Sequence, residues 1–346
     1  MCEAMYLRKN EKGLNDHVSI IKAIAMILLL YGHTGVPVLS HMLSMLRMPV
    51  FVMASGYCFK DYYLEHRAQF ARRRVKSLYW PFVKWSLIFL VLHNVLWLMG
   101  CYSPSIPCLS LRDMVERVPH ILVMHVQEEM LGGYWFISEL FFSTVIFIAL
   151  SPFIKRAPLL WCGIFLAVAI VMAQFGLHLR VRATTFLSVS FYTFGYWVRG
   201  KTLSHSWITI AVLLAVVVTA SLYVPGHFNR IYPRTTVLFY VIVLLGAWMI
   251  AAIAYQIMMN CPRLSRVMAY IGNRTLMILT FHMTAMRLLS YVIVKCTHQP
   301  AEQIYQAPPY VLFPLYMLVG LLVPLGYDYV SRKVKLKLKD AVAWGK

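Results

Sequence analysis

Charged residues are scarce in this sequence, and acidic residues are the scarcest. Only 13% of the 346 residues are charged, whereas a soluble domain carries about 25%. Hydrophobic residues make up 60% of the chain, and its mean hydropathy is +0.66. Because apolar runs recur along the whole length, no sizeable soluble domain fits between them. The composition therefore predicts an integral membrane protein.

Other features that would indicate further chemistry or processing are also missing. The first residues, MCEAMYLRKNEKGLNDH, carry acids and no small-residue cleavage site, so we expect the first apolar run to be a retained span. The seven cysteines show no metal-type spacing, and we expect no metal site. Cys101 and Cys108 share a predicted outside loop, which leaves a disulfide and two free thiols as open alternatives.

The chain reads as a single membrane domain, residues 1–346, without repeats or long linkers. We expect short cytoplasmic tails at 1–17 and 331–346. An all-α bundle of about ten transmembrane helices follows from the length of apolar sequence that crosses a bilayer. The predicted spans lie near 18–38, 41–60, 78–100, 134–153, 159–176, 184–200, 206–224, 235–258, 271–295 and 309–330. The acid-containing segment 109–131 is predicted to be an interfacial or re-entrant helix.

Basic residues orient this predicted bundle. Lys and Arg total 33 against 13 Asp and Glu, and they gather before span 1 and after spans 2, 4, 6, 8 and 10. With ten spans, all of these segments fall on one side of the membrane. The positive-inside rule makes that side cytoplasmic and places both termini there. Nucleic-acid binding is a poor explanation of the charge because no basic soluble domain exists.

Polar residues within a span are informative because each costs free energy unless it has a partner or a use. Span 1 contains KAIAMILLLYGH, with Lys22 at one end and His33 at the other. Eleven helical positions turn the chain only ~20° past three full turns, so both side chains are predicted on one stripe, ~16 Å apart. The other buried polar residues are Glu139 in span 4, and His282 and Arg287 in span 9.

The predicted depths of these residues indicate a functional layout. His33, Glu139 and His282 fall at overlapping depths beyond mid-membrane, with Arg287 nearer the outside. Lys22 and the basic run 72–76 lie at the cytoplasmic face. Lysine and arginine bind phosphate, and histidine is the usual general base near neutral pH. Coenzyme A has the matching shape, with a phosphorylated head and a long arm that ends in a thioester.

Five segments in order resemble the signature of the acyltransferase-3 family of membrane acyltransferases. The first is the Lys–x10–His of span 1. The others are MPVFVMASGYCF (48–59), RRRVKSLYWPF (72–82), YWFISELF (134–141) and YIGNRTLMILTFH (270–282). Each segment alone is weak evidence for the family, but five segments in the family's order across residues 16–282 make a strong match.

The resemblance implies transfer of an acyl group, usually acetyl, from cytoplasmic acyl-CoA to an acceptor on the far side. The acceptor is commonly a sugar hydroxyl of a surface glycan, and the setting a bacterial plasma membrane. His33 is then the catalytic histidine, and from their predicted depths we also assign catalytic roles to Glu139 and His282. We assign the donor phosphates to Lys22, Arg73, Arg74 and Lys76, and acceptor binding to Arg287. The sequence departs from the family's pattern at two positions. Ser19 stands where the family often has an acid, and Ser77 stands where it often has arginine.

Simpler interpretations remain for each residue. His33 and His282 would also serve as packing histidines, Lys22 would snorkel to the interface, and Glu139 would neutralise Arg287. Ser55 and Gly56 favour close helix packing, and Asn273 favours a helix start. The competing function is a proton-coupled transporter or a lipid-linked glycan flippase, although the inverted repeats common in carriers are not detectable. A structural membrane partner does not explain basic and titratable residues at three-turn spacing.

Overall fold

The structure of the chain is a computed structural model that describes residues 11–36, 40–103, 105–177, 181–225, 228–299 and 310–344. The described residues form helices and connecting loops, and no strand lies among them. The chain divides into two compact units. Unit 1 comprises residues 1–32, 37–82 and 135–273, and unit 2 comprises 33–36, 83–134 and 274–346. Parts of the predicted tails, residues 1–10 and 345–346, lie outside the described residues.

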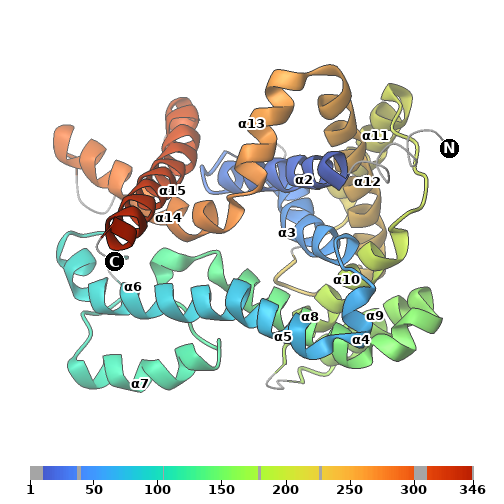
Figure 1. Cartoon of the computed structure of the whole chain (residues 1–346), viewed down its shortest axis with the longest axis horizontal. Helices are drawn as coiled ribbons and strands as arrows, with labels where there is room; N and C mark the ends of the chain where they lie inside the picture. Colours follow the sequence, from blue (N-terminus) through green and yellow to red (C-terminus); the bar gives the residue numbers. More distant parts are fainter. Residues whose placement is uncertain are drawn as a thin grey trace. The chain divides into compact units, whose positions relative to one another are not determined.

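Unit 1 is built around two crossing helices, α2 and α3, which pack against α10, α12 and α13 (Figure 1). Its elements are α2 (Glu11–Gly32), α3 (Ser40–Tyr57), α4 (Tyr62–Glu65), α5 (Arg67–Arg74), η1 (Val75–Tyr79), α8 (Tyr134–Arg156), α9 (Pro158–Gln174), α10 (Ala183–Val198), α11 (Trp207–Tyr223), α12 (Thr236–Asn260) and α13 (Pro262–Gly272).

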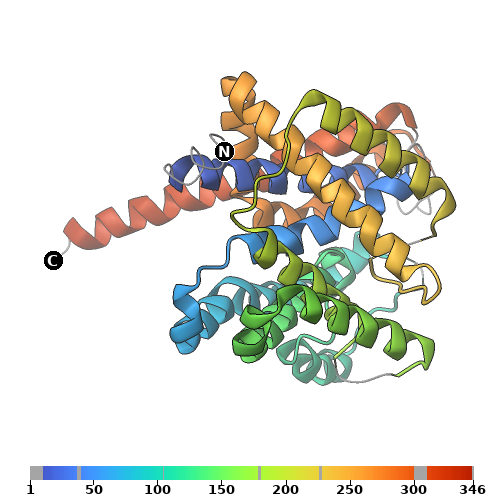
Figure 2. The same cartoon turned by 90° about the vertical axis from the view of Figure 1, so that its right-hand side faces the viewer.

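Unit 2 is organised by the pairing of α14 with α15. Its elements are most of α6 (Trp80–Leu98), α7 (Leu111–Leu122), η2 (Glu129–Leu131), α14 (Thr275–Cys296), η4 (Tyr310–Leu312) and α15 (Phe313–Trp344). Helix α15 continues without interruption to Trp344 (Figure 2). The buried Asp328 carboxylate on α15 accepts a hydrogen bond from Arg274 at 2.9 Å and forms an ion pair with Arg332 at 2.8 Å. The interaction with Arg274 fixes the start of α14.

Each predicted apolar segment corresponds to a helix, which confirms the all-α fold. Within the described ranges, five helical stretches are long and apolar enough to cross a membrane: Arg67–Leu98, Tyr134–Arg156, Thr236–Asn260, Thr275–Cys296 and Phe313–Lys337. Ten spans with both termini cytoplasmic stays a prediction. The segment predicted as interfacial contains α7, which begins with a capping box between Ser110 and Asp113. Its exposed Leu111 and Val115 give it an apolar surface.

The prediction that span 1 continues as a helix through His33 is wrong. Helix α2 ends at Gly32, and His33 lies in the turn that follows. The physical reason is the glycine-containing sequence GHTG: Gly35 adopts a φ of +73°, a left-handed conformation that favours glycine and ends a helix. Lys22 remains on the helix, ten residues before Gly32, or about 15 Å of helical rise.

Glycines let the backbones of α3 and α10 touch. A Cβ on Gly56 would overlap the carbonyl oxygen of Tyr192, and one on Gly195 would overlap the carbonyl oxygen of Met53. The close approach allows extensive dispersion contact without long side chains between the helices. It confirms the interpretation of Gly56 as a packing residue.

A similar contact joins α2 to α13. A Cβ on Gly272 would overlap the Ser19 carbonyl oxygen, and the Ser19 hydroxyl donates to Asn273 Oδ1 at 2.9 Å. Asn273 follows the last residue of α13 and caps that helix, so its interpretation as a helix start is wrong. Ser19, which departs from the family's acid, therefore serves the packing of α2 against α13.

We expect Gly56→Ala to lower the free energy of unfolding by about 1–3 kcal/mol, because the added methyl group has no room beside α10. The matched control is Gly163→Ala in α9, where no atom lies within 4 Å of the added methyl group. This control should be neutral or slightly stabilising, since alanine is the better helix former. Thermal unfolding of both purified variants in detergent measures the difference. Equal melting temperatures would contradict the close packing.

Candidate functional site

Two of the predicted histidines meet in unit 2. The ring centroids of His33 and His282 are 5.2 Å apart, with the ring planes inclined at 49°. His282 is completely buried, whereas His33 is half-buried. His33 comes from the turn after α2, and His282 comes from the middle of α14. The structure thus joins side chains that are 249 positions apart in the chain.

Backbone carbonyls fix the tautomer of His282. Its Nδ1 lies 3.0 Å from the carbonyl oxygens of Ile278 and Leu279, which can only accept. Nδ1 therefore carries the proton, and in the neutral ring Nε2 is the basic nitrogen. An imidazole with a fixed tautomer is suited to exchanging protons through one defined nitrogen, here beside His33.

The backbone before α8 approaches α14 closely at this histidine pair. A Cβ on Gly133 would overlap the Leu279 side chain and lie 3.7 Å from His282 Cε1. The next residue, Tyr134, hydrogen bonds to Thr280 Oγ1 at 2.8 Å. Since the Thr280 hydroxyl donates to the Leu276 carbonyl, Tyr134 supplies the proton in this bond. The close approach and the hydrogen bond together hold α14 in place around His282.

Glu129 is a site residue that the sequence interpretation missed. It lies in η2, which packs against α14, and it interacts electrostatically with Arg287. Burial raises the pKa of Glu129, and the Arg287 guanidinium partly counters this shift. Arg287 also interacts with the thiol of Cys101. The available sequence signal was an acid in EEMLGG, directly before a predicted span.

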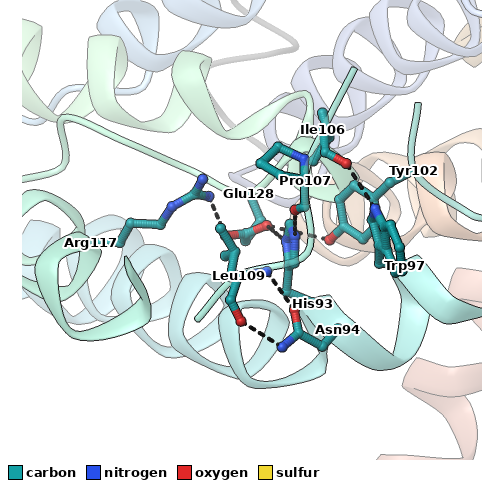
Figure 3. Close-up of polar contacts among 9 residues, drawn as sticks. All are labelled: His93, Asn94, Trp97, Tyr102, Ile106, Pro107, Leu109, Arg117 and Glu128. Carbon is teal, nitrogen blue, oxygen red and sulfur yellow. Dashed lines mark hydrogen bonds and ion pairs between the residues drawn. The ribbon is translucent and has the colours of Figure 1, made fainter. Parts of the chain in front are cut away.

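A buried polar network holds the loop that carries Glu129 (Figure 3). His93 Nδ1 lies 2.9 Å from Glu128 Oε2, and its Nε2 lies 3.2 Å from the Pro107 carbonyl. Arg117 of α7 and Tyr102 also donate to the Glu128 carboxylate, both at 3.3 Å. Because the carboxylate is fully buried, these partners are needed to offset its desolvation. The network thereby connects α6 and α7 to the residue that precedes Glu129.

The loop between α6 and α7 is held by neutral hydrogen bonds as well. The Asn94 amide donates to the Leu109 carbonyl at 2.8 Å and accepts from the Leu109 backbone N–H at 2.9 Å. Trp97 Nε1 donates to the Ile106 carbonyl at 2.8 Å. Of the two predicted loop cysteines, Cys101 is buried and Cys108 is exposed, and both are free thiols. The loop is thus ordered without a disulfide.

The predicted phosphate-binding residues lie in unit 1. Lys22 interacts electrostatically with Cys58, at the end of α3, which also interacts with Arg74 and Lys60. Arg74 stacks over the Phe70 ring at 4.8 Å and approaches the Tyr192 hydroxyl at 3.4 Å. Its buried Nε has no acceptor within the described part of the chain. Lys22 and Arg74 therefore form one cationic site near Cys58. In this site the Arg74 Nε–H can donate to a ligand.

The remaining basic residues are arranged differently. Arg73 donates to the Tyr63 hydroxyl at 2.6 Å, and Lys76 is exposed. Lys76 belongs to η1, a π-helical turn between α5 and α6. Single π-helical turns are frequent at functional sites. Arg74, just before the turn, is half-buried, whereas Lys76 within it is exposed.

Glu139 has partners of its own in unit 1. One carboxylate oxygen accepts from Thr184 at 2.9 Å, and the other accepts from Thr185 at 2.5 Å. Both hydroxyls belong to the first turn of α10, so the buried Glu139 joins α8 to that helix. These bonds support a packing role, and its catalytic role stays a prediction.

Arg47 is a second polar residue that the sequence interpretation missed. It lies on α3, and its guanidinium packs against Gly32, where a Cβ would overlap it. Gly32 is the last residue of α2 before His33. The sequence signal was an arginine within the second apolar run.

Comparison with known families adds an independent finding. Residues 15–328 match the acyltransferase-3 family model, which is described as an acyltransferase domain. The matched segment covers most of both units and contains every residue discussed in this subsection. No curated protein and no solved structure matches the chain.

The raised pKa of Glu129 predicts a pH-dependent stability. The folded protein holds this proton more tightly than the unfolded chain does. Its contribution to the free energy of unfolding is therefore present at acidic pH and is lost as pH rises through the raised pKa. We expect Glu129→Gln to remove this part of the pH dependence. Thermal unfolding of both proteins across the acidic range checks it, and parallel curves would contradict the assignment.

Proposed function

The chain belongs to the acyltransferase-3 family, and we propose that it transfers an acyl group from cytoplasmic acyl-CoA to a hydroxyl of an extracytoplasmic glycan. The acyl group is proposed to be acetyl, which makes the protein an O-acetyltransferase. The observation that carries the proposal is the contact between His33 and His282, with the tautomer of His282 fixed by two carbonyls.

In the proposed reaction His33 acts as general base. It removes the proton from the acceptor hydroxyl as that oxygen attacks the thioester carbonyl. The resulting tetrahedral intermediate collapses with cleavage of the carbon–sulfur bond, and the imidazolium returns the proton to the leaving thiolate. The products are an ester and free coenzyme A. His282 adjoins the base that becomes cationic, and its unprotonated Nε2 favours that charge.

Phosphates of the donor are assigned to the cationic site of unit 1. Lys22 and Arg74 supply charge there, and the Arg74 Nε supplies an N–H group that has no acceptor in the described chain. Arginine suits phosphate because its planar fork donates several hydrogen bonds at once. Arg73 and Lys76, the neighbours on α5 and η1, would add to the attraction at longer range.

Acceptor binding is assigned to the opposite end of the proposed topology. Arg287 and Glu129 provide one cation and one carboxylate, a set suited to hydrogen bonding several sugar hydroxyls. Under the ten-span topology this region faces outside and Lys22 faces the cytoplasm. Both termini are then cytoplasmic, and the proposed location is the bacterial plasma membrane.

A proton-coupled transporter or a glycan flippase is the competing function. Either would move its cargo without consuming thioester, whereas the proposed enzyme consumes one acyl-CoA per acceptor. The two classes therefore differ in stoichiometry as well as in sidedness.

We expect vectorial transfer in sealed vesicles of known orientation. Labelled acetyl-CoA on the cytoplasmic face should acetylate a glycan on the opposite face, and free coenzyme A should remain on the donor side. His33→Ala should lower turnover by ~10²–10⁴-fold, the usual loss of an acid–base group. The control His120→Ala changes an exposed histidine of α7 and should retain turnover.

Near-normal turnover of a folded His33→Ala protein would contradict the general-base role. Movement of unmodified glycan without acyl donor would favour the flippase. Transfer that requires both substrates on one face would contradict the sidedness.

We also expect the cationic site to determine donor affinity. Replacing Lys22, Arg73 and Arg74 together by Gln should weaken coenzyme A binding ~10-fold or more, because hydrogen bonds between charged groups are lost. Binding to the wild type should weaken with added salt, and more steeply than in the variant. Lys155→Gln, an exposed cation at the end of α8, is the matched control. Unchanged affinity in the triple variant, measured by calorimetry, would remove the donor role.

A further inference from the structure

Unit 1 contains a cavity of about 820 Å³ that neither the histidine pair nor the cationic site uses. Its walls come from α2, α3, α10 and α12, together with the segment that leads from α10 to α11. Apolar side chains form most of the lining, and Val241 at its edge is 45% exposed. The cavity therefore opens to the surroundings of the unit along an apolar flank.

Polar groups gather at one end of this cavity. His17 donates through Nε2 to the Ala251 carbonyl at 2.9 Å, and its ring meets His205 edge-on at 6.1 Å. From Ala251 the lining of α12 extends ten residues back to Val241, a rise of about 15 Å. The cavity is thus long and amphipathic, with an apolar body and a polar mouth.

The mouth is cationic. Arg199 and Lys201 line it, and no acidic residue of the described chain does. Arg199 is bound to Asp61 and to the Phe59 carbonyl. Lys201 lies over the Trp197 ring at 4.3 Å and forms no ion pair within the described residues. Lys201 therefore presents the mouth's uncompensated positive charge.

His17 adds an unsatisfied hydrogen-bond acceptor. Because its Nε2 donates to Ala251, Nδ1 is the unprotonated nitrogen of the neutral ring. His17 lines the cavity and is only 5% exposed, and its Nδ1 has no partner among the described residues. A buried acceptor without a donor is unfavourable. Because this nitrogen is not exposed to the empty cavity, a ligand hydroxyl satisfies it when the adjacent lining shifts slightly.

We propose that this cavity binds an anionic glycerophospholipid with a hydroxylated headgroup, of the phosphatidylglycerol type. One acyl chain lies along the apolar body between α3 and α12. The phosphate faces Lys201, and a headgroup hydroxyl donates to His17 Nδ1. A choline headgroup offers no such donor and places a fixed cation against Lys201. The site is independent of acyl transfer, since it shares no residue with the proposed reaction.

The test measures binding of dioctanoyl lipids to the purified full-length protein in detergent by native mass spectrometry. We expect phosphatidylglycerol to bind more tightly than phosphatidylcholine. Lys201→Gln should weaken the binding of phosphatidylglycerol about fivefold, which is the loss typical of removing one cation near an anionic lipid. The matched control is Lys155→Gln, an exposed cation of unit 1 outside the cavity, which should change nothing.

Two further variants separate the parts of the site. His17→Phe keeps a planar ring but removes the Nδ1 acceptor, so it should reduce the preference for the hydroxylated headgroup. Ala247→Phe places a larger side chain in the cavity without altering its mouth, so it should weaken the binding of both lipids. Unfolding temperatures of the lipid-free variants establish that each is folded.

Equal affinity for the two lipids would overturn the proposal, as would equal losses in Lys201→Gln and Lys155→Gln. Displacement of bound phosphatidylglycerol by coenzyme A would also overturn it, because the cavity would then belong to the donor. Loss of acyl transfer in His33→Ala has no bearing on these measurements.

Discussion

The close backbone contact between α3 and α10 is the constraint on which most of unit 1 depends. Gly56 and Gly195 remove the side chains that would otherwise separate the two helices. The contact places Cys58, at the end of α3, in the same site as Lys22 and Arg74. It also sets Met53 and Gly195 in the wall of the lipid-sized cavity. Two proposed binding sites therefore depend on one packing interaction.

The packing of unit 2 depends on the free-energy cost of burying polar groups, because each buried polar group needs partners that offset its desolvation. Glu128 is offset by His93, Tyr102 and Arg117, which belong to three separate segments. Satisfying that one carboxylate draws α7 and the loop between α6 and α7 together. The neighbouring Glu129 differs, because burial raises its pKa and the Arg287 guanidinium only partly counters that shift. One carboxylate thus organises the loop, and the next interacts with Arg287.

Several polar residues singled out from the sequence also form hydrogen bonds that hold helices together. Glu139 joins α8 to α10 through two threonines, and Ser19 joins α2 to Asn273. Neither role was apparent from the sequence, because the partners lie far away along the chain. The histidine pair differs: His282 is oriented by carbonyls of its own helix, so its tautomer follows from local geometry once α14 has formed.

By itself the sequence determined the all-helical class, the approximate positions of the helices and the family, because these follow from apolar run lengths and from local motifs. It also indicated His33 and His282 as residues of one site. Only the tertiary structure decided that α2 ends at Gly32, that Glu129 interacts electrostatically with Arg287, and that Arg47 packs beside Gly32. It alone decided the cavity beside His17 as well. Helix ends, ion pairs and cavities depend on contacts between segments that are distant in the sequence. The spacing of apolar residues along the chain does not predict such contacts.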